Sequence, residues 1–345
     1  MAQDVGNTIV LGQTAPSVGP QAGIVRNFNE GAKAYFAKVN KLGGIYGRKI
    51  ELISINDNDH PELASKNVEE LISKQKVFAL FGNGLGANAY EVRQRYTSAG
   101  IPNFAPLSGA DDLRFPLDRF AFNIKAGYKD EAVKLVDMLY TTQAQSVAVV
   151  MTGHPEQKNA LHHLQRALSR KSFKPAKVFL IDGDNTSQAI INDKPDAIVL
   201  LAPAAISTPL IKKLRSAQMN AQLWIPSFVG PSELSAELGS DSRGVGFSYV
   251  VPYPFTYNTP VSLELANELR DNTSFSALEG YIAAKVFCEG LRRVGAKLSR
   301  QNFVKVLEAG AFDAGGYTVR FAFNDHEGSK FVDTGVMTRA TKMLH

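Results

Sequence analysis

The alternation of apolar runs with helical segments constrains the fold of this chain more than any other feature. Ten runs have the composition of strands, many of them near-continuous Val, Ile, Leu and Phe, at residues 7–13, 49–55, 77–82, 101–106, 119–124, 146–151, 176–181, 196–202, 222–227 and 246–251. Such runs are typical of strands in a parallel sheet that helices cover on both faces. Between them, apolar residues recur at spacings of three and four, as in residues 25–42. We therefore predict a doubly wound α/β fold.

The length of the chain predicts two lobes. With 345 residues it exceeds one ordinary domain, and a single sheet of about ten strands is larger than most. Besides residues 25–42, we expect helices near 61–76, 87–99, 129–140, 156–170, 206–218, 260–270, 276–294 and 300–309. Two Rossmann-like lobes of about five strands each, with a ligand cleft between them, account for this order.

Composition excludes several classes of protein. No run of 18 apolar residues is present, so no membrane span is expected. The net charge is +5, but the basic residues are scattered, and no nucleic-acid partner is expected. The single cysteine, Cys288, lies in an apolar helical run and is expected to be buried. The start of the chain lacks the features of a signal peptide, which leaves a cytoplasmic protein or a removed signal peptide.

Residues 82–87, GNGLGA, match one version of the dinucleotide fingerprint through Gly82, Gly84 and Ala87. A dinucleotide site also needs Asp or Glu at the tip of the next strand, where it binds the ribose. That tip here is Pro106-Leu107-Ser108. We therefore expect no cofactor, and an NAD(P)-dependent oxidoreductase remains the alternative.

Other catalytic patterns are absent from the sequence. It contains neither a P-loop motif nor a G-x-S-x-G elbow. The histidines His154, His162 and His163 do not have the spacing of a zinc motif. We expect no catalytic residue and no metal site. Glycine, hydroxyl and amide groups at strand tips indicate a protein that binds a small molecule.

Several segments together resemble one known family. They are NEGAKAYFAKVNKLGGIYGRKIELISINDND, IPNFAPLSGADDLR, RFAFNIKAGYKDEAVKLV, SFVGPSELSAELG and SALEGYIAAKVFCEGLRRVG. In this order they resemble the periplasmic branched-chain amino-acid-binding proteins, the leucine/isoleucine/valine-type solute-binding components of ABC transporters. The resemblance covers nearly the whole chain. It implies a type I periplasmic binding fold, whose two Rossmann-like lobes are joined by three hinge crossings.

The resemblance also implies lobe boundaries. Lobe I comprises residues 1–123 and 254–325, and lobe II comprises 124–253 and 326–345. It further implies a periplasmic protein without its signal peptide, acting as a monomer with an inner-membrane ABC permease. A ligand-sensing regulatory domain of the same fold is a second alternative.

The family's ligand contacts transfer to two sets of positions. In lobe I they fall on the loops after the first, third and fourth strands and on the late helix: Ser17, Val18, Gly84, Leu85, Gly86, Leu107, Ser108, Gly109, Glu279 and Tyr281. For Tyr281, a place in the helix core is an equal alternative. In lobe II and its first crossing they fall on Tyr128, His154, Glu156, Ala205 and Phe228.

Lobe II departs from the family pattern. His154 and Glu156 stand where relatives often have an acidic pair, and Ala204 and Ala205 replace an expected aromatic residue. These differences put branched-chain amino acids in doubt as the ligand. The expected ligand is therefore a small carboxylate, either an amino acid or an aromatic or aliphatic acid.

Overall fold

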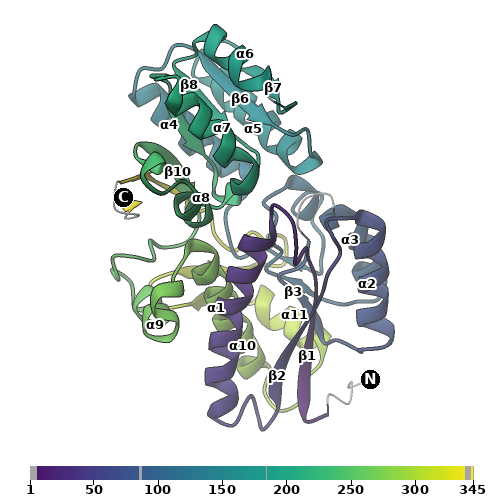
Figure 1. Ribbon diagram of the computed structural model, residues 1–345. Coiled ribbons are helices and arrows are strands. Elements are labelled where there is room, and N and C mark those ends of the chain that lie inside the picture. Colours follow the sequence, from purple (N-terminus) through teal and green to yellow (C-terminus); the bar gives the residue numbers. More distant parts are fainter. Residues whose placement is uncertain (1–5, 85–87, 184, 339–342, 345) are drawn as a thin grey trace. The chain divides into compact units, whose positions relative to one another are not determined.

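The computed structural model describes residues 6–84, 88–183, 185–338 and 343–344. The chain divides into two compact units, one formed by Met1–Ala126 with Val251–Lys330 and the other by Gly127–Val250 with Phe331–His345 (Figure 1). The chain therefore passes from one unit to the other three times. Each unit contains a largely parallel sheet flanked by helices, which confirms the predicted α/β fold class of two doubly wound lobes.

The first unit is built on five parallel strands in the order β2-β1-β3-β4-β5. Their bounds are Thr8–Thr14 (β1), Lys49–Ile55 (β2), Ala79–Phe81 (β3), Asn103–Phe104 (β4) and Ala121–Phe122 (β5). Helices α2 (Pro61–Ser73) and α3 (Asn88–Ser98) pack together, and their side chains share a core cluster with β3 that includes Leu71 and Leu80. All five strands were predicted from their apolar runs.

Helices α1 (Ala22–Lys41) and α10 (Phe275–Val294) lie side by side in this unit although they are far apart in sequence (Figure 1). Phenylalanine side chains fill the space between these helices and the sheet, with Phe81 in contact with Phe28, Phe36 and Phe287. Cys288 on α10 is buried, as expected, and burial raises the pKa of its thiol. The unit is completed by α9 (Pro260–Leu269), α11 (Arg300–Glu308), and the antiparallel pair β11 (Ala311–Asp313) and β12 (Thr318–Arg320).

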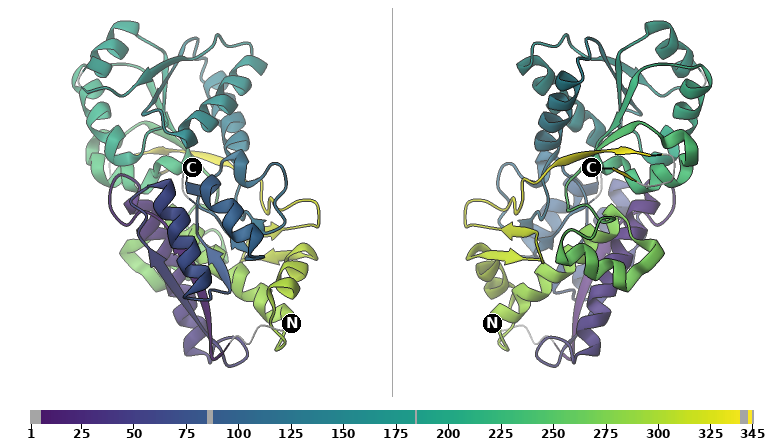
Figure 2. Two further views of the ribbon diagram at one scale, coloured as in Figure 1. Left: turned by 90° about the vertical axis from the view of Figure 1, so that its right-hand side faces the viewer. Right: turned by 90° about the vertical axis from the view of Figure 1, so that its left-hand side faces the viewer.

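The second unit contains a seven-stranded sheet in the order β14-β13-β10-β9-β8-β6-β7. The parallel strands are β6 (Val147–Met151), β7 (Lys177–Leu180), β8 (Ala197–Leu200), β9 (Gln222–Ile225) and β10 (Val245–Tyr249). The C-terminal segment adds β13 (Asp333–Met337) antiparallel to β10, drawn in yellow in Figure 2, and then β14 (Met343–Leu344). The helices are α4 (Tyr128–Thr141), α5 (Pro155–Arg170), α6 (Asn185–Asp193), α7 (Ala204–Ser216) and α8 (Pro231–Leu238).

The parallel strands of both units have the same connectivity. The order β7-β6-β8-β9-β10 repeats the order β2-β1-β3-β4-β5, with the strands taken in the sequence of the chain. The two units thus repeat one pattern of strand pairing. Among the described residues, every helix is too short or too polar to cross a bilayer.

Candidate functional site

In each sheet, one pair of adjacent loops lies where the strand order reverses direction. From the first strand of each unit, the chain adds one neighbour on one side and the remaining strands on the other. Open α/β sheets bind ligands beside the carboxyl ends of their strands at such a switch point. In the first unit these loops are residues 15–21 after β1 and the segment that begins at Gly82 after β3. In the second they are residues 152–154 after β6 and 201–203 after β8.

The loop after β1 carries the predicted residues Ser17 and Val18 on a tethered backbone. The Ser17 N–H donates to Oδ1 of Asn56 at 2.9 Å. At the end of β1, the Thr14 hydroxyl donates to the buried carboxylate of Asp57 at 3.1 Å. Val18 leaves 61% of its surface exposed. The loop therefore places a hydroxyl and an apolar side chain at the carboxyl edge of the sheet.

The loop after β3 begins with the glycines of the dinucleotide fingerprint. Gly82 has a positive φ of 63°, and a Cβ there would lie 2.4 Å from the ring of Phe28. A glycine is therefore required by the turn and by helix packing, without any cofactor. Gly84 is buried and has a φ of 77°. The predicted contacts Leu85 and Gly86, and Ala87 of the fingerprint, lie outside the described residues.

Leu107, Ser108 and Gly109 follow β4, and their N–H groups differ in availability. Those of Leu107 and Ser108 donate to backbone carbonyls of the loop after β3, at 3.3 and 3.1 Å. Within the described part of the chain, the buried N–H of Gly109 has no partner. The Ser108 Oγ accepts the N–H of Ala110 at 3.1 Å. The Gly109 N–H can thus donate to a ligand without breaking a hydrogen bond within the protein.

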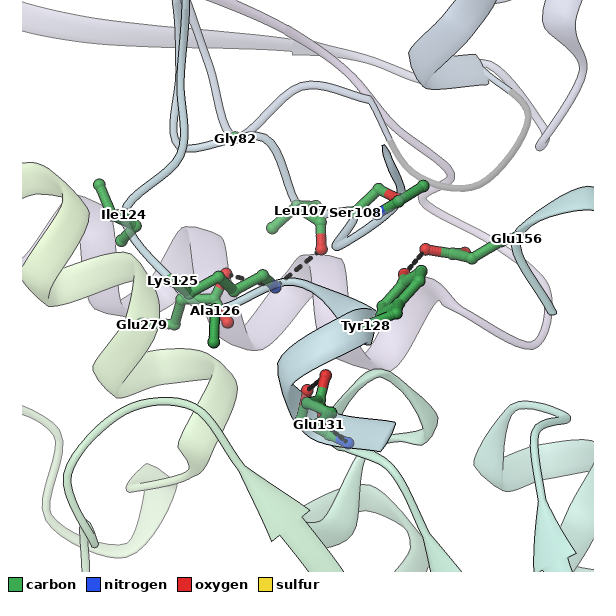
Figure 3. A network of polar contacts seen from close by, with 12 residues as sticks. Gly82, Leu107, Ser108, Ile124, Lys125, Ala126, Tyr128, Glu131, Glu156 and Glu279 are labelled. Carbon is green, nitrogen blue, oxygen red and sulfur yellow. Dashed lines mark hydrogen bonds and ion pairs between the residues drawn. The ribbon is translucent and has the colours of Figure 1, made fainter. Parts of the chain in front are cut away.

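A buried ion pair supports this loop (Figure 3). Lys125, three residues beyond β5, has its Nζ 2.8 Å from the carbonyl oxygen of Leu107 and 2.8 Å from Oε1 of Glu279. Both charged side chains are about nine-tenths buried. The contact with Glu279 is an ion pair without hydrogen-bond alignment. Glu279, a predicted ligand contact, is thereby linked to the loop that contains Ser108.

Tyr281 lies in the helix core of the first unit, which is one of the two positions that the sequence left open. Its side chain is fully buried, and its ring meets that of Tyr35 edge-on at 5.1 Å. Its hydroxyl donates to Glu264 at 3.3 Å. Burial, with the nearby carboxylate of Glu264 as the next cause, raises the pKa of Tyr281. The hydroxyl therefore stays protonated and has a protein partner.

In the second unit, helices α4 and α5 bring the predicted residues Tyr128 and Glu156 together. His154 directly precedes α5, and Glu156 lies in the first turn of that helix, after Pro155. The Tyr128 hydroxyl donates to Oε1 of Glu156, and both side chains are buried (Figure 3). A carboxylate here would favour a ligand group that donates hydrogen bonds or carries positive charge.

Phe228 also belongs to this group, because its ring lies 4.6 Å from that of Tyr128. A small pocket next to them is lined mainly by apolar side chains, among them Leu135 and Val199, and also by Glu131. Its volume is about 10 Å³, which is enough for one water and not for a ligand. This pocket therefore has no room for a ligand. Ala205, in the first turn of α7, is exposed.

Sequence reasoning missed three buried charged residues of these networks. Glu131 accepts hydrogen bonds from the Ser227 N–H and hydroxyl, at 2.8 and 2.9 Å, and from the Ser248 hydroxyl at 2.6 Å. Lys125 and Arg114 contact the loop after β4. The signal for Lys125 was its position directly after an apolar strand, where a lysine is at the carboxyl edge of the sheet.

The chemistry that these groups offer is recognition of a small polar molecule. The first unit supplies a backbone N–H and a serine hydroxyl, and the second supplies a tyrosine–carboxylate pair beside an aromatic ring. Within the described residues, no cluster of three or more His, Cys, Asp and Glu side chains is placed to hold a metal ion.

Comparison with known proteins supports this interpretation. The profile of a family described as "Periplasmic binding protein" matches residues 8–335. An amino acid binding protein of Pseudomonas aeruginosa is 28% identical over 98 residues, which are 28% of this chain and 26% of that relative. This match therefore spans about a quarter of the relative's length.

Solved structures match over nearly the whole chain. A possible leucine/isoleucine/valine-binding protein from Rhodopirellula baltica SH 1 has a TM-score of 0.91 at 22% identity, covering 100% of this chain and 98% of that one. A substrate-binding periplasmic protein from Ralstonia solanacearum has a TM-score of 0.87 at 28% identity, covering 97% and 99%. A solute-binding protein of an ABC transporter from R. palustris, in complex with benzoate, has a TM-score of 0.86 at 16% identity, covering 98% and 95%.

Proposed function

Because this chain belongs to the family of periplasmic binding proteins, we propose that it is the solute-binding component of an ABC importer. In this proposal it works in the periplasm as a monomer without catalytic activity. It captures a small carboxylate between its two units and delivers it to an inner-membrane permease. A sensor of the same ligand would share the binding step and differ only in the partner.

The observation that carries the carboxylate assignment is the loop after β4. It combines the unpaired N–H of Gly109, as judged from the described residues, with the hydroxyl of Ser108. Hydrogen bonds from such donors to a charged carboxylate contribute roughly 1.5–3 kcal/mol each. Two bonds of this kind would supply much of the free energy of binding.

The second unit bears on the rest of the ligand. An amino acid also needs a partner for its ammonium group, and Glu156 of the Tyr128–Glu156 pair is the predicted carboxylate contact in that unit. Benzoate is the ligand in one of the similar structures. From the second unit, its ring would need only an apolar contact such as the side chain of Phe228. We therefore include both an aliphatic amino acid and an aromatic acid in the proposed ligand class.

The energetics of a small ligand require burial on most sides. A micromolar Kd corresponds to about −8 kcal/mol. For a ligand of roughly ten heavy atoms this is about −0.8 kcal/mol per atom, below the ceiling of about −1.5 but attainable only with near-complete burial. Closure of two units over the ligand provides such burial in proteins of this architecture.

A thermal-shift panel tests the proposal. Ligand-stripped protein is mixed with L-leucine, L-valine, L-phenylalanine, benzoate, 4-hydroxybenzoate and octanoate, and with NADH to test the oxidoreductase alternative. At about 100 times Kd, a true ligand stabilises by about 2.7 kcal/mol, which corresponds to a rise in Tm of roughly 4 °C. Stabilisation by NADH alone would contradict the proposal.

A further inference from the structure

The backbone of residues 107–110 is held by two buried cations. Besides Lys125 on the Leu107 carbonyl, the Nε of Arg114 donates to the carbonyl of Gly109 at 3.3 Å. The Arg114 side chain is 1% exposed and that of Lys125 is 8% exposed. Burial of two charged side chains against one short loop is costly unless each is paired, so their arrangement calls for an explanation.

Each cation is paired with one acid. Lys125 pairs with Glu279 at 2.8 Å, and Nη1 of Arg114 lies 3.6 Å from Oε1 of Glu327. The two positive and two negative charges therefore cancel. The network has little net field to attract an anion, and its effect on the loop is mainly geometric.

The geometric effect follows from the planar peptide group. In a trans peptide, the C=O and the next N–H point in opposite directions. Arg114 holds the Gly109 carbonyl on one side, and the N–H of Ala110 is then turned toward Ser108 Oγ, 3.1 Å away. Lys125 fixes the Leu107 carbonyl in the same way, with the Ser108 N–H directed to the loop after β3. These two fixed peptide groups set the orientation of the Gly109 N–H between them.

Arg114 also contacts the segments that lead out of the first unit. Its Nη2 donates to the carbonyls of Lys125 and Ala126 at 3.3 and 3.5 Å, immediately before the first crossing. Glu327 lies on the segment that leads to the third crossing, and residues 326 and 328 of that segment hydrogen-bond to Asn123. One buried side chain thus joins the loop to both crossing segments.

We propose that Arg114 is a positioning residue that presets the loop of residues 107–110 for the ligand carboxylate and couples this loop to the first and third crossing segments. The proposal rests on the proposed function in one respect, the identity of the group that the loop binds. Arg114 acts through the backbone of Gly109 and does not itself contact the ligand.

The test compares Arg114→Met and Arg114→Lys with a matched control, Arg300→Met. Arg300 also donates to two backbone carbonyls of the first unit, those of Phe78 and Val77, at 2.9 and 2.8 Å, but at the opposite end of β3. Hydrogen exchange of ligand-free protein is measured for peptides covering residues 107–110 and 123–128. Calorimetry with L-valine and with benzoate then measures affinity.

We expect Arg114→Met to speed hydrogen exchange in both peptides. We also expect it to lower the affinity for the probe that binds by about tenfold or more, the equivalent of one lost charge-assisted hydrogen bond. Arg114→Lys keeps the positive charge near Glu327, but a lysine cannot donate to three carbonyls at once. Compared with Arg114→Met, it should therefore recover more of the Tm than of the affinity for L-valine or benzoate. Arg300→Met should lower the Tm without either local effect.

Unchanged exchange at residues 107–110 in Arg114→Met, or the same local changes in Arg300→Met, would overturn the proposal. If the unmodified protein binds neither L-valine nor benzoate, it is the proposed ligand class that fails. The exchange measurement needs no ligand and still decides whether Arg114 positions the loop.

Discussion

At the scale of single residues, the acids near the predicted contacts all have partners within their own unit. Glu279 pairs with Lys125, Glu156 accepts from Tyr128, and Glu131 accepts from Ser227 and Ser248. A buried carboxylate without partners would be strongly destabilising. These pairs hold the side chains in place before any ligand arrives, which lowers the entropy that binding must overcome.

The clearest prediction at this scale concerns Ser108. Ser108→Ala removes the hydroxyl that we expect to donate to the ligand, and the affinity for L-valine or benzoate should fall about tenfold. The same change removes the acceptor of the Ala110 N–H, so the free energy of unfolding should also fall, by about 1 kcal/mol. Calorimetry and urea denaturation measure the two effects separately.

Ser274→Ala is the matched control for Ser108→Ala. Ser274 is also buried in the first unit, and its hydroxyl accepts the N–H of Ala277 at 3.0 Å. The Ser274→Ala variant should lose a similar amount of free energy of unfolding, while its affinity for L-valine or benzoate stays unchanged. If Ser108→Ala behaves in the same way as this control, Ser108 is a structural cap and not a ligand contact.

The sequence predicted some residues of the candidate site better than others. Ser108 and Gly109 were predicted because the family resemblance transfers a ligand contact to the loop after the fourth strand. Lys125 and Arg114 were missed because their roles depend on backbone carbonyls and acids that are distant in the sequence, such as Glu279 for Lys125. For Tyr281, the apolar spacing of a helix is compatible with both the core and a site, and only packing distinguishes them.

At the scale of elements, the contact between α1 and α10 depends on two glycines. A Cβ at Gly31 would lie 1.8 Å from the carbonyl oxygen of Ala277, and a Cβ at Gly280 would lie 1.9 Å from that of Phe28. Glycine in a helix normally costs about 1 kcal/mol relative to alanine. Here close approach of the two backbones outweighs that preference. The contact joins the N-terminal and C-terminal parts of the first unit.

Gly280→Ala should therefore destabilise the first unit although it improves helix propensity. Because the added methyl group meets backbone, the helices must separate, and we expect a loss of about 1–3 kcal/mol in the free energy of unfolding. Urea denaturation followed by circular dichroism measures it. Gly290→Ala on the same helix is the comparison, since its nearest atom, 2.8 Å away, belongs to the side chain of Phe303 and not to backbone. An equal effect of the two substitutions would contradict this explanation.

Most elements were predicted from the sequence, and the missed ones are helices α6 and α8 and strands β11–β14. The ten apolar runs all correspond to strands, and the nine expected helices correspond to α1–α5, α7 and α9–α11. Helix α8 has eight residues, and strands β11 and β12 have three each, too few for a periodic pattern. Strand β13 begins with two polar residues and a glycine, and it is stabilised by antiparallel pairing with β10, which local sequence does not reveal.

At the scale of the whole molecule, the proposed function divides one site between two units of the same connectivity. The strand order predicts where ligand-binding loops lie in each unit, because it locates the switch point. The periodicity of the sequence does not predict this strand order, because it does not encode which strands pair. The identity of the ligand depends further on single side chains such as Phe228 and Glu156.

A ligand that is enclosed by both units should protect both from hydrogen exchange. We expect saturating L-valine or benzoate to slow exchange in residues 107–110 of the first unit and in residues 152–157 and 226–230 of the second. The protection arises because exchange in the bound state requires opening with loss of the ligand, and at 100 times Kd that costs about 2.7 kcal/mol. In Ser108→Ala at the same ligand concentration, protection should fall in all three segments together. Protection confined to one unit would show that the ligand binds there without enclosure, and the closure step would then have to be abandoned.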